Sequence, residues 1–284
     1  MQTTNVAALD FATHANFRAG QLRSRKTLLA GQDNAAGNYW MGYFSGDDTG
    51  AADWGTPRHR HNFEQIRHPL TGAYTIAKDV DLPAGWVGYF PEGAYYGPQI
   101  WGPQTKMIAL QFGGPSRSGY LGPLQAKTGF EALQAAGVHF ENGAAIRVDA
   151  NGKRFNQDSY EAIWEHMRAR KLEYPKPRYD SYIMMNPASY DWVKDDSARG
   201  VAKKMMGVFT EYELKIGFIR LDPGATMNVA PEKAPQLFVL KEGAVKLRDE
   251  TFPGISAFEI AAGETASFTA KDPSEFYYIK LPTL

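Results

Sequence analysis

Residues 57–65 read PRHRHNFEQ, a glycine follows at position 72, and residues 85–96 read GWVGYFPEGAYY. In the first stretch, His59 and His61 are separated by one residue, so on a β-strand both side chains point to the same face. Inside a barrel their ring nitrogens would converge on one point. The spacing therefore predicts a site built around two imidazoles.

Apolar and aromatic runs, separated by Gly, Pro and Asp, surround this stretch on both sides. They cover residues 39–44, 65–76, 86–90 and 107–112 in the first half of the chain, and 216–221, 237–247 and 275–281 near its end. Short strands joined by tight turns are typical of β-sandwiches and barrels. We therefore expect a β-rich region at each end of the chain.

The middle of the chain has a different pattern. Residues 128–136 and 158–171 are predicted to be helices, the second capped by Asp158 or Ser159. Between them, residues 139–155 are predicted to form a hairpin that turns at DANG, residues 149–152. We expect a structured connecting region, and whether it covers the site as a lid stays open.

The two β-rich ends resemble each other in sequence. QIRHPLTGA at 65–73 matches QLFVLKEGA at 236–244 without a gap, so Gln65 falls on Gln236. Further on, Ala84-Gly85 and Phe90 fall on Ala262-Gly263 and Phe268. We interpret the match as an ancient duplication. The second copy carries Ala230 and Glu232 at the positions of the paired histidines.

Residues 57–65 together with Gly72 resemble the first signature of the cupin superfamily: His-x-His, three or four residues, a Glu, then a glycine that ends the hairpin. The second signature is a Gly, five residues, Pro-x-Gly, two residues and a His. Gly85, Pro91 and Gly93 match it, and Tyr96 stands at the position of the His. The chain thus resembles a two-barrel cupin (bicupin) with a partly degenerate metal motif.

This resemblance implies an all-β fold with two cupin-type jelly-roll barrels joined by a partly helical connecting region. We expect residues 1–115 to form the barrel with the candidate site, 116–204 the connecting region, and 205–284 a second barrel that lacks metal ligands. The second barrel contains no histidine, so its predicted role is to stabilise the first barrel or a dimer.

The resemblance also implies a metal site formed by His59, His61, Gln65 and Tyr96, holding Fe, Mn, Ni, Cu or Zn. Gln65 stands where the family has Glu, and both Gln65 and Tyr96 are neutral near pH 7, so metal binding should be weaker than usual. Ionisation of Tyr96, or Glu64 turning inward, would strengthen it. Alternatively, the histidines bind backbone carbonyls, and Gln65 is kept for hydrogen bonding as in the second copy.

Arg67 lies two residues after Gln65 and therefore on the same strand face. It can bind a substrate carboxylate through two parallel hydrogen bonds, or it can close the barrel mouth by pairing with Glu64 or Glu92. His68 falls on the opposite face and is left out of the predicted site.

Aromatic residues crowd the stretch expected to face the histidines, namely Tyr89, Tyr95, Tyr96 and Trp101, with Gln99 among them. Such a wall favours an aromatic or otherwise flat ligand, although ordinary core packing explains any one of these residues singly. The predicted substrate-binding residues are Arg67, Tyr95, Gln99 and Trp101, and the predicted catalytic residues are Tyr96, Arg67 and Glu64.

For function, the resemblance implies dioxygenases, isomerases, decarboxylases and lyases. We expect a metal-dependent enzyme acting on a small aromatic or carboxylate-bearing molecule, with a dioxygenase favoured because imidazole ligands suit iron and copper and leave open positions. Arg67 would orient an acidic group and Tyr96 would donate or accept a proton. The alternatives are a non-catalytic small-molecule binder, which Gln65 and Tyr96 favour, a cupin isomerase or lyase, and a structural or regulatory interaction protein.

Charge and composition narrow the partners. The 31 basic residues balance 31 acidic ones, which argues against binding of nucleic acid or an anionic membrane surface. The chain has no cysteine, so disulfides and thiolate metal sites are excluded. Residues 1–17 lack a secretory signal pattern and no run approaches ~18 apolar residues, so we expect a cytoplasmic protein. The resemblance further implies a homodimer paired through strand edges.

Overall fold

The structure is a computed structural model that describes residues 1–16, 21–32, 37–46, 55–102 and 104–284, with residues 13–16 and 21–24 described by backbone only. The chain forms two compact units. Unit 1 comprises Met1–Asp10, Lys26–Ala30 and Met185–Leu284, and unit 2 comprises Phe11–Arg25 and Gly31–Met184. These bounds differ from the predicted ones, because residues from both ends of the chain contribute to unit 1.

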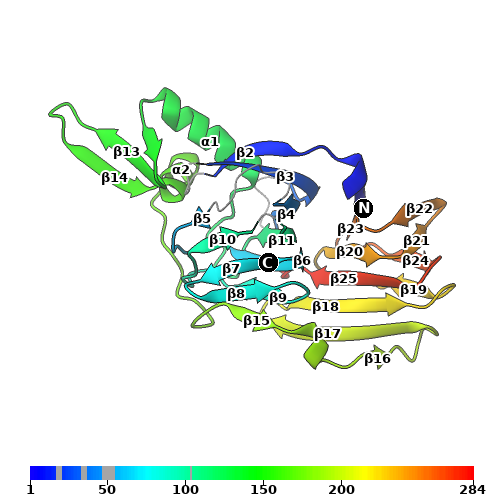
Figure 1. Ribbon diagram of the computed structural model, residues 1–284. Coiled ribbons are helices and arrows are strands. Elements are labelled where there is room, and N and C mark those ends of the chain that lie inside the picture. Colours follow the sequence, from blue (N-terminus) through cyan, green and yellow to red (C-terminus); the bar gives the residue numbers. More distant parts are fainter. Residues whose placement is uncertain (17–20, 33–36, 47–54, 103) are drawn as a thin grey trace. The chain divides into compact units, whose positions relative to one another are not determined.

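Unit 2 contains a four-stranded antiparallel sheet and most of a seven-stranded one (Figure 1). The larger sheet has the order β15-β9-β6-β11-β4-β3-β2, formed by β2 (Ala12–Asn16), β3 (Gln21–Ala30), β4 (Tyr39–Ser45), β6 (Glu64–Thr71), β9 (Val87–Phe90), β11 (Lys106–Phe112) and β15 (Ile183–Met185). The smaller has the order β5-β10-β7-β8, formed by β5 (Gly55–Thr56), β7 (Ala73–Ala77), β8 (Val80–Pro83) and β10 (Gln99–Trp101).

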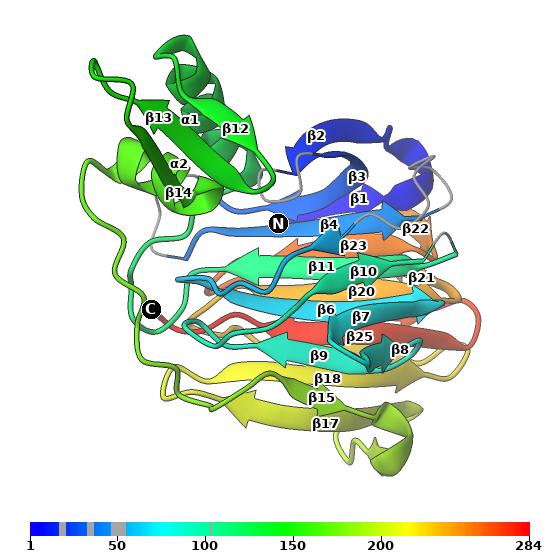
Figure 2. The ribbon, with the colours of Figure 1, turned by 60° about the vertical axis from the view of Figure 1, so that its left-hand side comes forward.

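The predicted connecting region forms two helices and a third sheet that gather at one end of unit 2 (Figure 2). Helix α1 covers Pro123–Ala135 and α2 covers Ser159–Arg168, which begins after Asp158 as predicted, because its carboxylate accepts from the Glu161 N–H at 3.1 Å. The sheet consists of β12 (His139–Glu141), β13 (Ala144–Val148) and β14 (Arg154–Asp158). The expected hairpin is thus extended to three strands. Among the described residues, no helix is both long and apolar enough to cross a membrane.

Unit 1 repeats the two-sheet arrangement. Its larger sheet has the order β1-β23-β20-β25-β18-β17-β16, formed by β1 (Gln2–Asn5), β16 (Val193–Lys194), β17 (Val201–Phe209), β18 (Leu214–Leu221), β20 (Gln236–Glu242), β23 (Ser256–Ile260) and β25 (Ser274–Lys280). Its smaller sheet has the order β19-β24-β21-β22, formed by β19 (Thr226–Val229), β21 (Ala244–Leu247), β22 (Glu250–Pro253) and β24 (Ala266–Ala270). Short 3-10 helices cover Val6–Ala8 and Pro187–Ser189.

Each unit has its own hydrophobic core, with side chains from its larger and its smaller sheet. In unit 2, Phe90 and Met107 come from the larger sheet, and Ile76 comes from the smaller. In unit 1, Phe238 comes from the larger sheet and Phe268 from the smaller. This is the packing of a sandwich or barrel in which alternate residues of each strand face inward.

The strand orders support the duplication and correct part of its alignment. Strands β2 to β11 recur in the same order as β16 to β25, with β6 equivalent to β20. The predicted match of Gly85 with Gly263 is wrong, because Gly85 precedes β9 whereas Gly263 follows the equivalent strand, β23. Gly93 is the equivalent residue: its N–H donates to the His61 carbonyl at 2.7 Å, and that of Gly263 donates to the Glu232 carbonyl at 2.9 Å.

Candidate functional site

The paired histidines lie side by side, although most of their segment is not a strand. They occupy the connection between β5 and β6, where only His59 forms a bridge, exchanging backbone hydrogen bonds of 2.9 and 3.0 Å with Tyr96. The two ring centroids are 4.8 Å apart, and His59 is 7% exposed. The ring Nδ1 of His59 is 2.6 Å from the Pro57 carbonyl oxygen, which only accepts, so Nδ1 carries the proton in this contact.

Aromatic rings surround the imidazoles. The Tyr96 ring centroid lies 4.5 Å from that of His59 and 5.8 Å from that of His61. His61 also contacts Phe63 at 4.2 Å and Tyr160 at 5.5 Å. Tyr160 belongs to α2, so the connecting region contributes directly to the wall of the site.

A buried hydrogen-bond network begins two residues after Phe63. The Gln65 amide oxygen accepts from Arg67 Nη2 and, at 3.1 Å, from Gln111 Nε2. The Gln65 Nε2 donates to the Tyr96 hydroxyl. At the other end, the Tyr120 hydroxyl donates to the Gln111 amide oxygen at 3.1 Å. Gln65 therefore holds Arg67 and Tyr96 together.

The inward orientation of Arg67 follows from the register of the strands. Gln65, Gln111 and Trp40 lie in one row across β6, β11 and β4, and Arg67, Ala109 and Gly42 lie in the next. Gly42 makes room for a folded-over ring, because a Cβ there would lie 2.1 Å from the Trp40 ring. The small residues beside Arg67 thus leave space for long side chains from neighbouring positions.

Arg67 is 4% exposed, and its Nε and Nη1 make no hydrogen bond within the part of the chain that the structure describes. Neither predicted carboxylate pairs with it. Glu64 faces the other side of β6 and accepts from the Tyr89 hydroxyl at 2.7 Å, and Glu92 accepts from Arg178 at 3.1 Å. Burial, together with the neighbouring Glu64, raises the pKa of Tyr89 far above its usual value.

Comparison with known proteins shows a similarity of fold and no match in sequence. No protein-family model and no curated protein matches the chain in sequence. Among solved structures, a candidate dioxygenase from Nostoc punctiforme matches with a TM-score of 0.61 at 9% identity, over 99% of this chain and 82% of that one. The chain has the two-barrel cupin fold. Two further solved structures are similar in fold. Bacillus subtilis oxalate decarboxylase matches with a TM-score of 0.56 at 10% identity, over 100% of this chain and 76% of that one. Acinetobacter baumannii quercetin 2,3-dioxygenase matches with a TM-score of 0.52 at 14% identity, over 100% of this chain and 86% of that one.

The second cupin barrel shows what the fold itself requires at these positions. Gln236 is equivalent to Gln65, and it too is a hydrogen-bonding residue, donating to the Ala230 carbonyl at 2.8 Å and accepting from Tyr278 at 3.1 Å. Phe238 is equivalent to Arg67 and is a fully buried core residue. The second barrel therefore uses its glutamine structurally, and it has an apolar residue where the first barrel has Arg67.

The other predicted site residues divide between the interior and the surface. Gln99 and Trp101 are 4% and 3% exposed, and among the described residues Gln99 Nε2 has no hydrogen-bond partner. Tyr95 is 44% exposed and stacks under Arg58 outside the barrel. His68, which was left out of the site, is fully buried and its Nδ1 lies 2.9 Å from the Trp86 carbonyl oxygen.

The predicted ligands fit only in part the metal that a cupin site implies. His59 has one ring nitrogen held by a backbone carbonyl, as metal-ligating histidines commonly do. The Gln65 oxygen already accepts two hydrogen bonds, and the adjoining Arg67 guanidinium repels a cation. The described residues contain no group of three or more His, Cys, Asp or Glu that could hold a metal ion. The imidazole pair thus offers two ligands, without an acidic one beside it in the described residues.

Sequence reasoning did not identify Gln111, Tyr120 or Tyr160 as members of this site, nor Arg25, whose Cζ lies 4.5 Å from the centroid of the Trp40 ring. The period-two pattern of β11, in which Met107 and Ala109 face the core, could have placed Gln111 inside. No local signal in the sequence indicated the other three.

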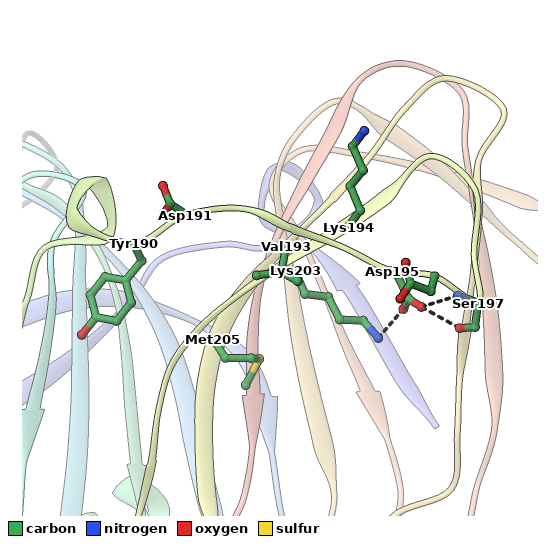
Figure 3. Close-up of a pocket in the computed structure, with 9 residues that line it drawn as sticks. Tyr190, Asp191, Val193, Lys194, Asp195, Ser197, Lys203 and Met205 are labelled. Carbon is green, nitrogen blue, oxygen red and sulfur yellow. Dashed lines mark hydrogen bonds and ion pairs between the residues drawn. The ribbon is translucent and has the colours of Figure 1, made fainter.

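A surface pocket of about 720 Å³ lies in unit 1, beside β16 and β17 (Figure 3). Asp195 accepts from Lys203 Nζ at 2.5 Å and from the Ser197 N–H and hydroxyl, bonds that lower its pKa to about 2. The pocket is lined by Tyr190, Asp191, Val193, Lys194, Asp195, Asp196, Ser197, Lys203 and Met205, all in the described part of the chain. Without histidine or arginine, this pocket is a weaker candidate than the interior of unit 2.

Proposed function

We propose that the protein is a cupin enzyme that binds a small carboxylate-bearing organic molecule in the barrel of unit 2 and acts on it beside His59 and His61. The burial of Arg67 carries this proposal. Its guanidinium keeps its charge, and each buried donor without a partner costs about 1–3 kcal/mol. A carboxylate that binds through Nε and Nη2, or through Nη1 and Nη2, provides a charged acceptor for one of these two donors.

The roles of the surrounding residues follow from their contacts. Gln65 fixes Arg67 in place, and Gln111 and Tyr120 fix Gln65 in turn. Gln99 Nε2 can donate to a second polar group of the ligand, and Trp101 and Phe90 present apolar surface to its carbon skeleton. Tyr96, in contact with both imidazoles, is positioned to donate or accept a proton.

A divalent transition metal belongs to this proposal. Structures of Bacillus subtilis oxalate decarboxylase are described with Mn(II) centres. In this chain His59 and His61 would hold the metal, which when bound would polarise a substrate oxygen as a Lewis acid. We favour dioxygenase chemistry, in keeping with the imidazole ligands, over that of an isomerase or lyase.

A non-catalytic small-molecule binder is the second candidate function. The engagement of the Gln65 oxygen by Arg67 and Gln111 favours it, because this side chain then serves ligand binding rather than metal coordination. The two candidates share the carboxylate site and differ in the need for a metal.

Metal analysis and ligand binding test the proposal separately. Protein purified without chelator should contain a transition metal that is lost in the His59→Ala, His61→Ala double variant. Calorimetry should show benzoate binding that Arg67→Met weakens at least about 10-fold. Arg154→Met, which changes an exposed arginine of β14, is the matched control.

Oxygen uptake with a panel of phenols and keto acids then tests the dioxygenase assignment. If neither the wild type nor the double variant contains a transition metal, the result would favour the non-catalytic small-molecule binder. Benzoate affinity that is equal in wild type and Arg67→Met would contradict the carboxylate site itself.

A further inference from the structure

Arg25 brings a second cation toward the interior that contains Arg67. It lies on β3, which is next to β4 in the larger sheet of unit 2, and its Cζ is 4.5 Å from the centroid of the Trp40 ring. That ring folds over Gly42, which lies in the same row as Arg67, two strands away and hence at roughly 10 Å. Two arginines thus approach one stretch of the barrel interior from different strands.

No carboxylate within the described residues forms an ion pair with either arginine, and Arg25 Nε is buried there without a hydrogen bond. Burial lowers the pKa of Arg25 to about 10, and the charge of Arg67 acts in the same direction while Tyr120 opposes it. Two like charges in a low-dielectric interior repel each other, so the arrangement gains stability when an anion joins it.

In the second barrel, by contrast, the inward-facing cations form ion pairs with glutamates. Lys280 is equivalent to Gln111 by strand register, is 2% exposed, and lies 3.2 Å from Glu213 and 4.0 Å from Glu232. Lys215, equivalent to Trp40, pairs with Glu232 at 3.0 Å. In unit 1 the same fold therefore neutralises the buried Lys280 and the partly exposed Lys215 with its own carboxylates. Among the described residues of unit 2, no carboxylate does the same for Arg25 or Arg67.

More positive charge lies beside the histidine pair. Arg58 and Arg60 alternate with His59 and His61, and their guanidinium carbons lie 4.3 and 4.9 Å from the exposed Tyr95 ring. Stacked guanidinium groups keep their charge and their in-plane N–H donors, so this surface attracts anions.

We propose that Arg25 and Arg67 together bind one small organic dianion, with a carboxylate on each guanidinium and the apolar part of the ligand against Trp40. This inference rests on the proposed function, because Arg67 is the carboxylate-binding residue in both. It adds Arg25 as a substrate-binding residue and narrows the ligand class from carboxylates to dicarboxylates. Stacking of Arg25 on Trp40 leaves the edge of its guanidinium open for bidentate binding.

Calorimetry at constant ionic strength tests the pairing, with phthalate and isophthalate as dianionic probes and benzoate as the monoanionic one. Wild type should bind the better dianion at least about 10-fold more tightly than benzoate. Arg25→Met should remove this preference while changing benzoate affinity less than about 3-fold. Arg67→Met should weaken all three probes, and Arg154→Met none.

A preference for the dianion that persists in Arg25→Met would overturn the inference while leaving the carboxylate site at Arg67 intact. Failure of benzoate and both dianions to bind the wild type would overturn the inference and the proposed function together. Should Arg25→Met fail to fold, Arg25→Lys decides: the ammonium keeps the charge but cannot bind bidentately, so the dianion preference should fall at least about 3-fold, and an unchanged preference would overturn the inference. A wild type that binds benzoate as tightly as either dianion contradicts the inference without any variant.

Discussion

Replacing Arg67 by methionine should stabilise the ligand-free protein while abolishing its anion binding. Methionine is close in length to the aliphatic part of arginine and carries no donor. The equivalent position in the other barrel is Phe238, a core residue, so an apolar side chain fits the fold here. The two effects have opposite signs, which is the behaviour expected of a residue kept for binding at the expense of stability.

The size of the stabilisation follows from the bonds of Arg67. The variant removes two buried N–H groups without partners, at about 1–3 kcal/mol each, and loses one charged hydrogen bond to Gln65 of about 1.5–3 kcal/mol. Gln65 keeps Gln111 as a donor, so its oxygen is not left without a partner. The middle of these ranges gives a net gain of about 2 kcal/mol, or a rise in the unfolding midpoint of roughly 4–8 °C for a domain of this size.

Chemical and thermal unfolding of wild type and Arg67→Met, without added anions, measure this gain. Gln65→Leu is the informative companion, because it leaves the guanidinium of Arg67 with no hydrogen-bond partner in the described residues and should lower stability by about 2–5 kcal/mol. A loss of 1 kcal/mol or more in Arg67→Met would refute the reasoning, since it would mean that the cation stabilises the fold.

Two further predictions concern other parts of the molecule. Gly42→Ala should lower the free energy of unfolding by about 1–3 kcal/mol, because the added methyl group meets the Trp40 ring at 2.1 Å; urea unfolding measures it, and an unchanged midpoint would show that the ring can move. Lys203→Met should cost less than about 1 kcal/mol at neutral pH. Because Lys203 is the largest of the causes that lower the Asp195 pKa from 3.8 to about 2, ahead of the bonds from Ser197, the difference should be present above pH 4 and shrink as the pH falls through 2. A difference constant from pH 6 to 2 would contradict this cause.

The sequence predicted the strands of both barrels well where apolar alternation is strong. The runs at 39–44, 107–112 and 275–281 became β4, β11 and β25 within one or two residues. It did not predict β2 and β3 or the early start of α1 at Pro123, because QLRSRKTLLA has no clear alternation and α1 begins at a glycine rather than at a side-chain cap. The place of residues 1–10 in unit 1 depends on pairing with β23, a contact distant in sequence.

At the candidate site, the sequence by itself determined which groups could meet. The His-x-His spacing keeps two imidazoles close together, although most of their segment is not a strand. Arg67 shares a strand face with Gln65, because side chains two residues apart on a strand point the same way. Only the tertiary structure decided that Gln65 binds Arg67, that no carboxylate of the described residues neutralises that arginine, and that Arg25 comes toward it across the sheet. The physical reason is that strand spacing is local, whereas the burial and pairing of a charge depend on strands that the chain brings together from far apart.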